Sequence, residues 1–374
     1  MNQSKTNSNG RLIAIITMFF IFAMISFVTN MAAPFGNIWG FKYSWSGMLG
    51  NLMNFAAYLF MGIPAGKMLT TVGYKKTSLI ALAVGVIGLF CQWLSSIFGA
   101  DITVFSQTTN VKHLVDGVIT ETPETVHVTL NLFIYLLGAF ICGFCVCMLN
   151  TVVNPMLNLL GGGGNKGNQM IQTGGALNSL SGTLTPFLVG ALLGTITKHT
   201  SMEDVAPLLF VGMGIFVFAF IVISRVSIPE PALERAKAMA AAGKNVKAKN
   251  QHSAWSFRHF VLGAIAIFFY VGVEIGIPGE LNFYLSDSDP VRGGGLLVNG
   301  AAIAGAIVAI YWLLMLVGRT LSSAISGKIS TKAQMTTVSL VALVLVLGAI
   351  FTPKTVGIDV PKFIYNPIEK TYDI

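Results

Sequence analysis

A single carboxylate stands out in a long apolar part of the chain. Glu274 lies within the run 260–285, where a helix that crosses a bilayer would normally carry no charge. A carboxyl held out of water favours its neutral form, so Glu274 could take up and release a proton. In its ionised form it could pair with Arg319, which lies in the next apolar run, although Arg319 could also extend to the membrane surface. Both residues indicate the handling of an ion or a polar solute.

Uncharged polar residues recur in several other apolar runs. Asn150 and Asn154 are four residues apart and would share one face of a helix, and Asn51 and Asn54 would do the same. Amides both donate and accept hydrogen bonds, which suits the recognition of a polar, uncharged solute. The alternative is hydrogen bonding between neighbouring helices. Asn30 and Asn178 lie in two further apolar runs.

Aromatic side chains could add a flat apolar surface for a sugar ring. Trp312 and Tyr311 lie together in the same apolar run as Arg319, and Tyr58 lies in the second run. We expect Trp312 to take part in substrate binding.

The sequence shows no pattern of an enzyme or a metal site. The cysteines, at 91, 142, 145 and 147, lie in apolar runs at spacings that match no standard zinc site. The glycines at 161–164 are followed by Asn165 and Lys166, which departs from the phosphate-loop pattern. No apolar run carries a Ser/His, His/Glu or paired-Asp arrangement. We therefore expect no catalytic residues, no metal and no cofactor.

The elements that position these residues are expected to be membrane-spanning helices. The chain is 54% apolar and 10% charged, whereas soluble domains are about 25% charged. Several apolar stretches are long enough to cross about 30 Å of hydrocarbon, which predicts an all-α membrane protein. The nine stretches are 12–35, 46–66, 77–98, 129–155, 170–195, 206–226, 259–285, 297–318 and 335–352.

Lysine and arginine positions predict the orientation. Most of them fall on one side of the predicted spans if the N-terminus is cytoplasmic, as the positive-inside rule requires. The net charge of +8 therefore indicates membrane topology rather than nucleic-acid binding. We expect a multi-pass protein of the cell inner (plasma) membrane that contacts lipid.

The spans divide into two groups. Residues 1–226 predict an N-terminal six-helix bundle, 227–257 a cytoplasmic linker, and 258–352 a partial bundle of about three helices. Residues 353–374 form a polar tail that cannot span. The outer loop 99–128 is long, and we expect a surface insertion, with a substrate lid as the alternative.

Five short motifs carry a resemblance to a known family. They are Gly62-Ile63-Pro64-Ala65-Gly66-Lys67 with Gly73-Tyr74-Lys75-Lys76, Cys147 through Asn154-Pro155, Asn168 through Asn178-Ser179, Tyr270 through Glu274, and Gly318-Arg319. The first resembles the loop between the second and third helices of major-facilitator transporters. The others resemble the fourth, fifth, seventh and eighth helices of the fucose–proton symporter branch, which includes fucose permease and glucose/galactose transporters.

The resemblance implies a bundle of two six-helix halves, of which the second has about three helices here. The chain is therefore expected to be C-terminally truncated. Fucose symporters carry an Asp and a Glu, implicated in proton binding and sugar contact, at positions that align with Asn30 and Asn150, by the anchors Pro34 and Asn154-Pro155. Amides do not exchange protons near neutral pH, so these two positions cannot couple transport to protons.

These features together predict a secondary active transporter for a sugar such as fucose, glucose or galactose. It would work by alternating access as a monomer, with H+ or Na+ as the coupling ion. Asn30, Asn150, Asn154, Asn178 and Trp312 are expected to contact the sugar. Glu274 and Arg319 would serve ion coupling or substrate binding. The alternatives are an uncoupled or sodium-coupled facilitator, a membrane sensor, and a non-functional truncated remnant.

Overall fold

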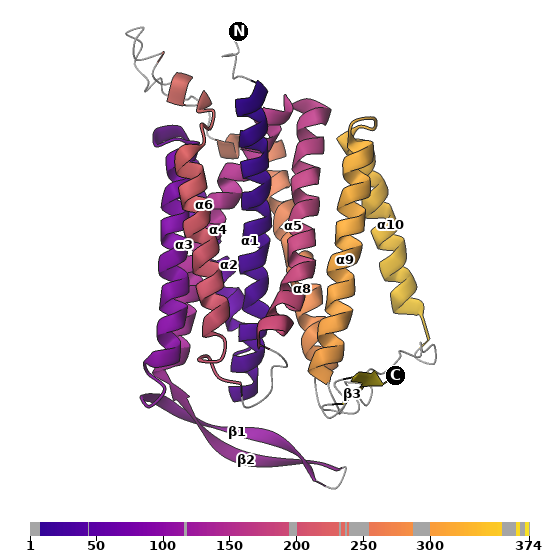
Figure 1. Ribbon diagram of the computed structural model, residues 1–374. Helices are drawn as coiled ribbons and strands as arrows, with labels where there is room; N and C mark the ends of the chain where they lie inside the picture. The colour runs from indigo at the N-terminus through magenta and orange to yellow at the C-terminus, as the bar shows by residue number, and fades with distance from the viewer. Residues whose placement is uncertain are drawn as a thin grey trace.

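The computed structural model describes residues 8–43, 45–115, 118–193, 200–231, 233–235, 238, 254–286, 300–353, 364–366 and 371–373. Within them, long helices run side by side, and a β-hairpin lies at the end of the bundle opposite the N-terminus (Figure 1). The helical membrane fold predicted from the sequence is confirmed. Most of the predicted linker and of the polar tail lies outside the described residues.

Each predicted span coincides with one long helix. These helices are α1 (Ser8–Lys42), α2 (Leu49–Thr71), α3 (Tyr74–Ile97), α4 (Leu130–Gly161), α5 (Gly164–Leu193), α6 (Ala206–Arg225), α8 (Arg258–Ser286), α9 (Gly300–Ser326) and α10 (Thr331–Phe351). A 3-10 turn, η1 (Ala254–Ser256), precedes α8. Among the described residues, seven helices are long and apolar enough to cross a membrane, and α2 and α5 are not among them.

Polar residues explain why α5 is less apolar than its neighbours. Its sequence carries Gln169, Thr173, Asn178 and Ser179 within three turns. This helix packs against α1, α4 and α9, and its polar side chains are buried or half-buried, so they face other helices. Such an interior position is where a bundle places polar residues that bind a solute.

The core of the first six helices depends on close backbone approach. A Cβ on Gly88 of α3 would lie 2.7 Å from the backbone N of Cys142 in α4, and one on Gly138 would lie 2.7 Å from the backbone N of Gln92. Small residues allow membrane helices to pack through van der Waals contact. As a result α3 and α4 form an extensive interface, and most residues along α4 are buried.

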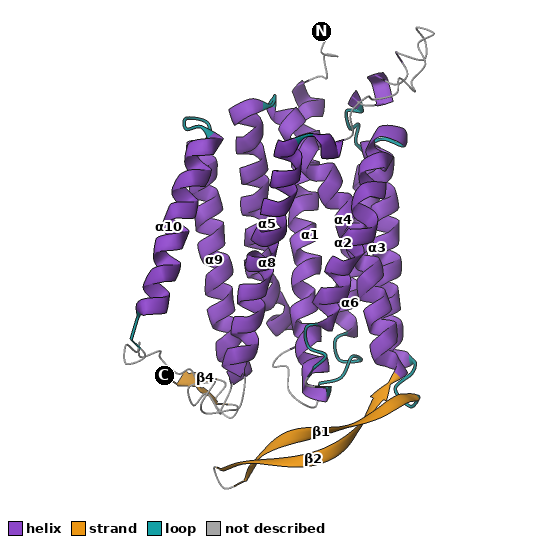
Figure 2. Cartoon of the chain, turned by 180° about the vertical axis from the view of Figure 1, so that it is seen from behind, coloured by secondary structure: helices purple, strands orange, loops and turns teal. Residues whose placement is uncertain are grey.

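The last three helices are far more exposed. In Figure 2, α10 stands at the edge of the bundle beside α9. No residue of α10 is buried, and its exposed side chains include Val338, Leu345 and Phe351. An exposed apolar surface of this kind suits contact with hydrocarbon.

The segment between α3 and α4 forms a long two-stranded hairpin, which the sequence did not predict. Strands β1 (Thr103–Val115) and β2 (Val118–Thr129) pair antiparallel, and their Thr and Val residues favour strands. The hydroxyl of Tyr43 anchors the base by donating to the carbonyl oxygen of His127 at 3.0 Å. Two short strands, β3 (Ile364–Asn366) and β4 (Thr371–Asp373), pair near the C-terminus.

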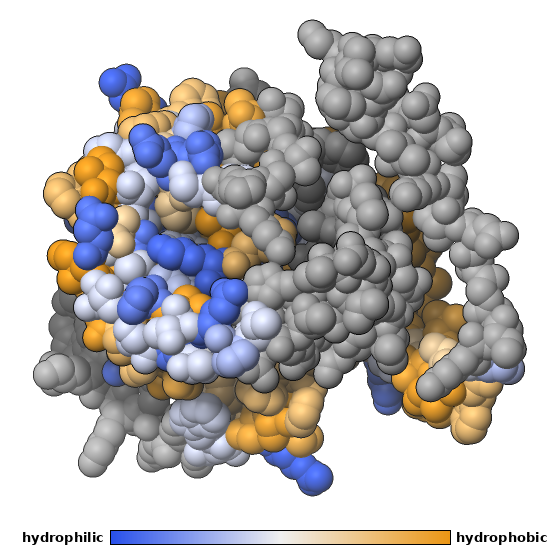
Figure 3. All heavy atoms as spheres, turned by 90° about the horizontal axis from the view of Figure 1, so that it is seen from below, coloured by the Kyte–Doolittle hydropathy of each residue, from blue (hydrophilic) through white to orange (hydrophobic). Residues whose placement is uncertain are grey.

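Viewed from the hairpin end, hydrophilic residues gather in the middle of the coloured surface and hydrophobic residues crowd its edge (Figure 3). This distribution is expected of a bundle whose sides face lipid and whose ends face water.

Candidate functional site

An ion pair joins α8 to α9 inside the bundle. The Nη2 of Arg319 lies 2.6 Å from Oε1 of Glu274, and the two side chains are 20% and 15% exposed. Among the described residues, the same Nη2 also donates to the hydroxyl of Tyr270 at 3.4 Å. Arg319 therefore turns toward a carboxylate instead of extending to the membrane surface, and each charge is compensated by the other.

Arg319 also reaches across to α5. Its Nη1 donates to the carbonyl oxygen of Gly175 at 3.1 Å, to Oγ of Ser179 at 3.1 Å and to Oδ1 of Asn178 at 3.5 Å. The planar guanidinium with its five N–H groups is suited to such a branched set of acceptors. One side chain therefore connects three helices, and we call these contacts the Arg319 cluster.

A row of neutral hydrogen bonds continues from this cluster toward the end of the bundle that carries the N-terminus. Thr173 Oγ1 and Ser323 Oγ lie 2.8 Å apart, and Nδ2 of Asn168 donates to Oγ of Ser326 at 3.3 Å. These contacts, which we call the polar seam, join α5 to α9. The seam and the Arg319 cluster hold the two helices together along the same edge.

Two of the predicted asparagines lie where α1 and α5 meet, Asn30 on α1 and Asn178 on α5. Nδ2 of Asn178 donates to the carbonyl oxygen of Phe22 in α1 at 2.9 Å. Nδ2 of Asn30 donates to the carbonyl oxygen of Ser26 at 2.8 Å. A Cβ on Gly182 of α5 would lie 3.1 Å from that Nδ2, so Asn30 packs one turn along α5 from the Arg319 cluster.

The other two asparagines form a separate pair on α4. Nδ2 of Asn150 donates to the hydroxyl of Tyr58 in α2 at 2.8 Å, and Nδ2 of Asn154 donates to the carbonyl oxygen of Asn150 at 3.1 Å. The first bond links α2 with α4, the second lies within α4, and neither involves Arg319. The structure therefore divides the predicted binding residues into two groups.

Tyr311 connects Trp312 to the backbone of Glu274. Its ring meets that of Tyr311 edge to face, with centroids 5.6 Å apart. The hydroxyl of Tyr311 donates to the carbonyl oxygen of Glu274 at 3.2 Å. An aromatic surface thus adjoins the backbone of Glu274. The described contacts of Trp312 do not include the predicted asparagines.

Comparison with known proteins agrees with this arrangement of long helices. The sequence model of the Major Facilitator Superfamily matches residues 12–363. The chain belongs to the major facilitator superfamily. Membership confirms the predicted family and the prediction that the chain is a transporter and not an enzyme.

Two proteins similar to this major-facilitator transporter are named as glucose/galactose transporters. It is 26% identical over 359 residues to a protein of Brucella abortus named "Glucose/galactose transporter", a match that covers 93% of this chain and 74% of that protein. It is also 24% identical over 373 residues to a provisionally named glucose/galactose transporter of Helicobacter pylori (strain J99), covering 94% and 79%. The transporter is therefore distantly related to glucose/galactose transporters along most of its length.

Several residues that shape the candidate site were not predicted from the sequence as site residues. Ser26 fixes the amide of Asn30, and Thr173 and Ser323 form the polar seam. The signal was present as spacing, because Arg319, Ser323 and Ser326 are four and three residues apart and share a helix face. In the described parts of the chain, no three His, Cys, Asp or Glu side chains come together as metal ligands.

Proposed function

We propose that this transporter carries a hexose or deoxyhexose such as glucose, galactose or fucose. The observation that supports the proposal most is the Arg319 cluster, which gathers a carboxylate, a guanidinium, an amide and a hydroxyl inside an apolar bundle. The names of the distant relatives point to the same class of substrate.

The chemistry of the cluster suits a polyhydroxylated ligand. A carboxylate accepts hydrogen bonds from sugar hydroxyls and a guanidinium donates to them, so Glu274 and Arg319 can hold neighbouring hydroxyls. Asn178 and Asn30, on opposite sides of the α1–α5 contact, can extend this set. In this proposal Asn150, Asn154 and Trp312 contact the ligand from α4 and α9.

Alternating access requires the contact between α5 and α9 to open and close. In the structure the polar seam and the Arg319 cluster close it at the N-terminal end of the bundle. Hydrogen bonds between membrane helices contribute about 0.6 kcal/mol each, so the neutral seam can open at small cost. We infer that the main resistance to opening lies at Arg319.

Protonation of Glu274 provides a coupling mechanism. The proton would remove the negative charge 2.6 Å from Arg319 and leave the guanidinium without a countercharge in the cluster. An unpaired charge in the bundle is destabilising, so this arrangement would give way to one in which Arg319 meets water. Proton uptake would thereby favour the alternative access state.

The arrangement in the membrane follows the charge pattern. We propose that residues 1–226 form the N-terminal bundle, 227–257 a cytoplasmic linker, and 258–352 the C-terminal group of helices. We propose that the N-terminus lies in the cytoplasm and the hairpin outside, in the cell inner (plasma) membrane, because this orientation puts most basic residues on the cytoplasmic side. We propose that the protein acts as a monomer.

Transport by purified protein in lipid vesicles tests the proposal. Labelled glucose, galactose and fucose should each be offered in counterflow, which needs no ion gradient, and then under an imposed pH gradient. We expect counterflow of at least one sugar and accumulation only with an inward proton gradient. Absence of counterflow with every sugar would refute the substrate class.

Substitutions separate the binding and coupling roles. Glu274→Gln should lose accumulation but retain counterflow at a higher half-saturating sugar concentration, because glutamine still hydrogen-bonds a sugar hydroxyl but cannot exchange a proton. Glu280→Gln, at an exposed position of the same helix, should leave both counterflow and accumulation intact. If sugar uptake survives Glu274→Gln and responds to a sodium gradient, the protein is a sodium-coupled facilitator. If uptake survives Glu274→Gln and responds to no gradient, the protein is an uncoupled facilitator.

A further inference from the structure

Two buried amide oxygens in the N-terminal helices lack a hydrogen-bond donor among the described residues. They are Oδ1 of Asn54 in α2 and Oε1 of Gln92 in α3. The two residues are 4% and 6% exposed. A buried acceptor without a donor is destabilising, and native proteins contain few of them.

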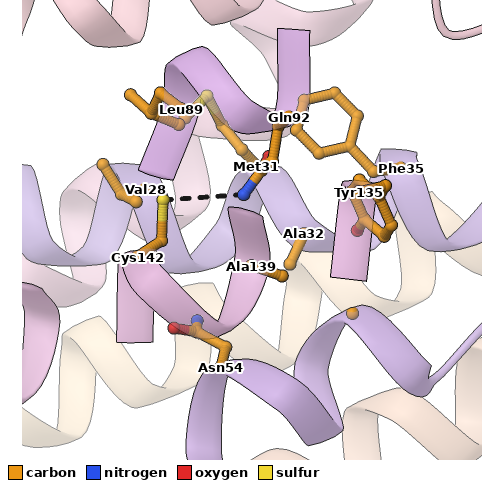
Figure 4. Close-up of a pocket in the computed structure, with 11 residues that line it drawn as sticks. Val28, Met31, Ala32, Phe35, Asn54, Leu89, Gln92, Tyr135, Ala139 and Cys142 are labelled. Carbon is orange, nitrogen blue, oxygen red and sulfur yellow. Dashed lines mark hydrogen bonds between the residues drawn. The ribbon is translucent and has the colours of Figure 1, made fainter. Parts of the chain in front are cut away.

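Both side chains line the same cavity, enclosed by α1, α2, α3 and α4 (Figure 4). Its volume is about 10 Å³, which is roughly the room that one water molecule needs. The amide nitrogen of Gln92 faces Cys142 and donates to its Sγ at 3.5 Å. The remaining lining is mostly apolar and includes Met31 and Leu89.

We propose that this cavity binds a single internal water molecule that bridges Asn54 and Gln92. Two acceptors require two donors, and one water supplies both of its hydrogens. Water also accepts hydrogen bonds, so it satisfies either side chain even if the amide is rotated by half a turn. Tyr135 lines the same cavity, and its hydroxyl is a further group with which the water can bond.

The lining favours a neutral ligand over a monovalent cation. None of the residues around the cavity is a carboxylate, so a bound cation would lack a countercharge. A cation would also exchange its hydration shell for two amide oxygens and an otherwise apolar wall, which is unfavourable.

The water would act as a bridge between two helices that make few direct contacts. Most of the packing of α2 and of α3 is against α4, and the direct α2–α3 contact is small. A water between Asn54 and Gln92 fastens α2 to α3 across the cavity. It lies away from the Arg319 cluster, so this inference does not depend on the nature of the transported solute.

A double-substitution cycle tests the bridge. Asn54→Leu and Gln92→Met each remove one partner of the water and leave the other oxygen unpaired. Each single variant should lower the midpoint of thermal unfolding by about 2–4 °C, and the double variant should lower it by much less than the sum. The proposal is overturned if each single variant keeps or raises the midpoint and the double variant shows the sum of the two changes. That result would mean that the two oxygens are unpaired and independent of each other.

Radiolytic oxidation of the unmodified protein is a second readout that needs no variant to fold. Water bound beside a buried methionine generates hydroxyl radicals within reach of its sulfur. Met31 lines the cavity, whereas Met18 is equally buried and does not. We expect Met31 to oxidise faster than Met18, and equal protection of the two would contradict the proposal.

Salt dependence identifies a cation if one binds instead. Unfolding should be compared in sodium chloride and in choline chloride at equal ionic strength. The bridging water predicts the same midpoint in both salts. A sodium-specific rise that disappears in the Asn54→Leu/Gln92→Met variant would replace the water by a cation site.

Discussion

The ion pair between Glu274 and Arg319 makes a quantitative prediction about stability. Arg319→Met leaves a carboxylate, 15% exposed, without its partner at 2.6 Å. Glu274→Met leaves the guanidinium with neutral acceptors only. Loss of one member of a buried ion pair costs about 3–5 kcal/mol, and because both side chains retain some exposure we expect the lower end, about 3 kcal/mol for each variant.

The double variant is the informative measurement. With both charges removed, no unpaired ion remains, and apolar replacement of a complete pair is often neutral. The contacts of Arg319 with α5 are still lost, so we expect destabilisation of about 3 kcal/mol where additivity would give about 6 kcal/mol.

Buried thiols provide the assay. Cys142 and Cys145 are fully enclosed in the α3–α4 interface, so a thiol-reactive fluorophore reports unfolding in lipid nanodiscs as denaturant is added. Lys328→Met, at an exposed position after α9, serves as the control and should change stability by less than about 0.5 kcal/mol. Additive effects of the two substitutions at the ion pair would refute a coupled pair.

Two further predictions concern other contacts. Gly182→Ala places a methyl group 3.1 Å from the amide nitrogen of Asn30 and should weaken sugar binding in counterflow. Gly214→Ala, whose added methyl group would have nothing within 4 Å, should leave binding unchanged. Equal effects of the two substitutions would argue against a sugar site at Asn30. The carboxylate of Glu230 accepts hydrogen bonds from two backbone N–H groups in the first turn of α3, at 2.6 and 2.8 Å. Glu230→Gln should therefore speed hydrogen exchange in that turn and lower the free energy of unfolding by about 1 kcal/mol. The same exchange rate in Glu230→Gln and in the control Glu234→Gln would contradict this capping role.

The helical part of the fold could be predicted because the bilayer imposes a length and an apolar composition on each span. The hairpin could not be predicted in the same way. Its strands contain charged and polar residues with no regular apolar alternation, and its base depends on Tyr43, a residue more than eighty positions away from its partner His127. Contacts of that kind are visible only in three dimensions.

The same limit applies to the candidate site. Glu274 could be singled out because a charge in an apolar run is unusual. The sequence allowed either proton uptake by Glu274 or an ion pair with Arg319. The sequence could not indicate that Arg319 would also reach the carbonyl oxygen of Gly175. A glycine carries no side-chain signal, and the helix rotation that exposes its carbonyl depends on packing. The division of the asparagines into two groups has the same origin.

The exposure of α10 has a consequence for how this helix is held in place. It is joined to α9 near their connecting turn, where Nε2 of Gln334 donates to the carbonyl oxygen of Ser322 at 3.3 Å. In the part of the chain that the structure describes, its apolar side chains contact little protein. In the two-stage view of membrane protein folding, insertion and helix association are separate steps. For α10 insertion supplies nearly all of the stabilisation, so its position beside α9 should follow the thickness and lateral pressure of the surrounding lipid.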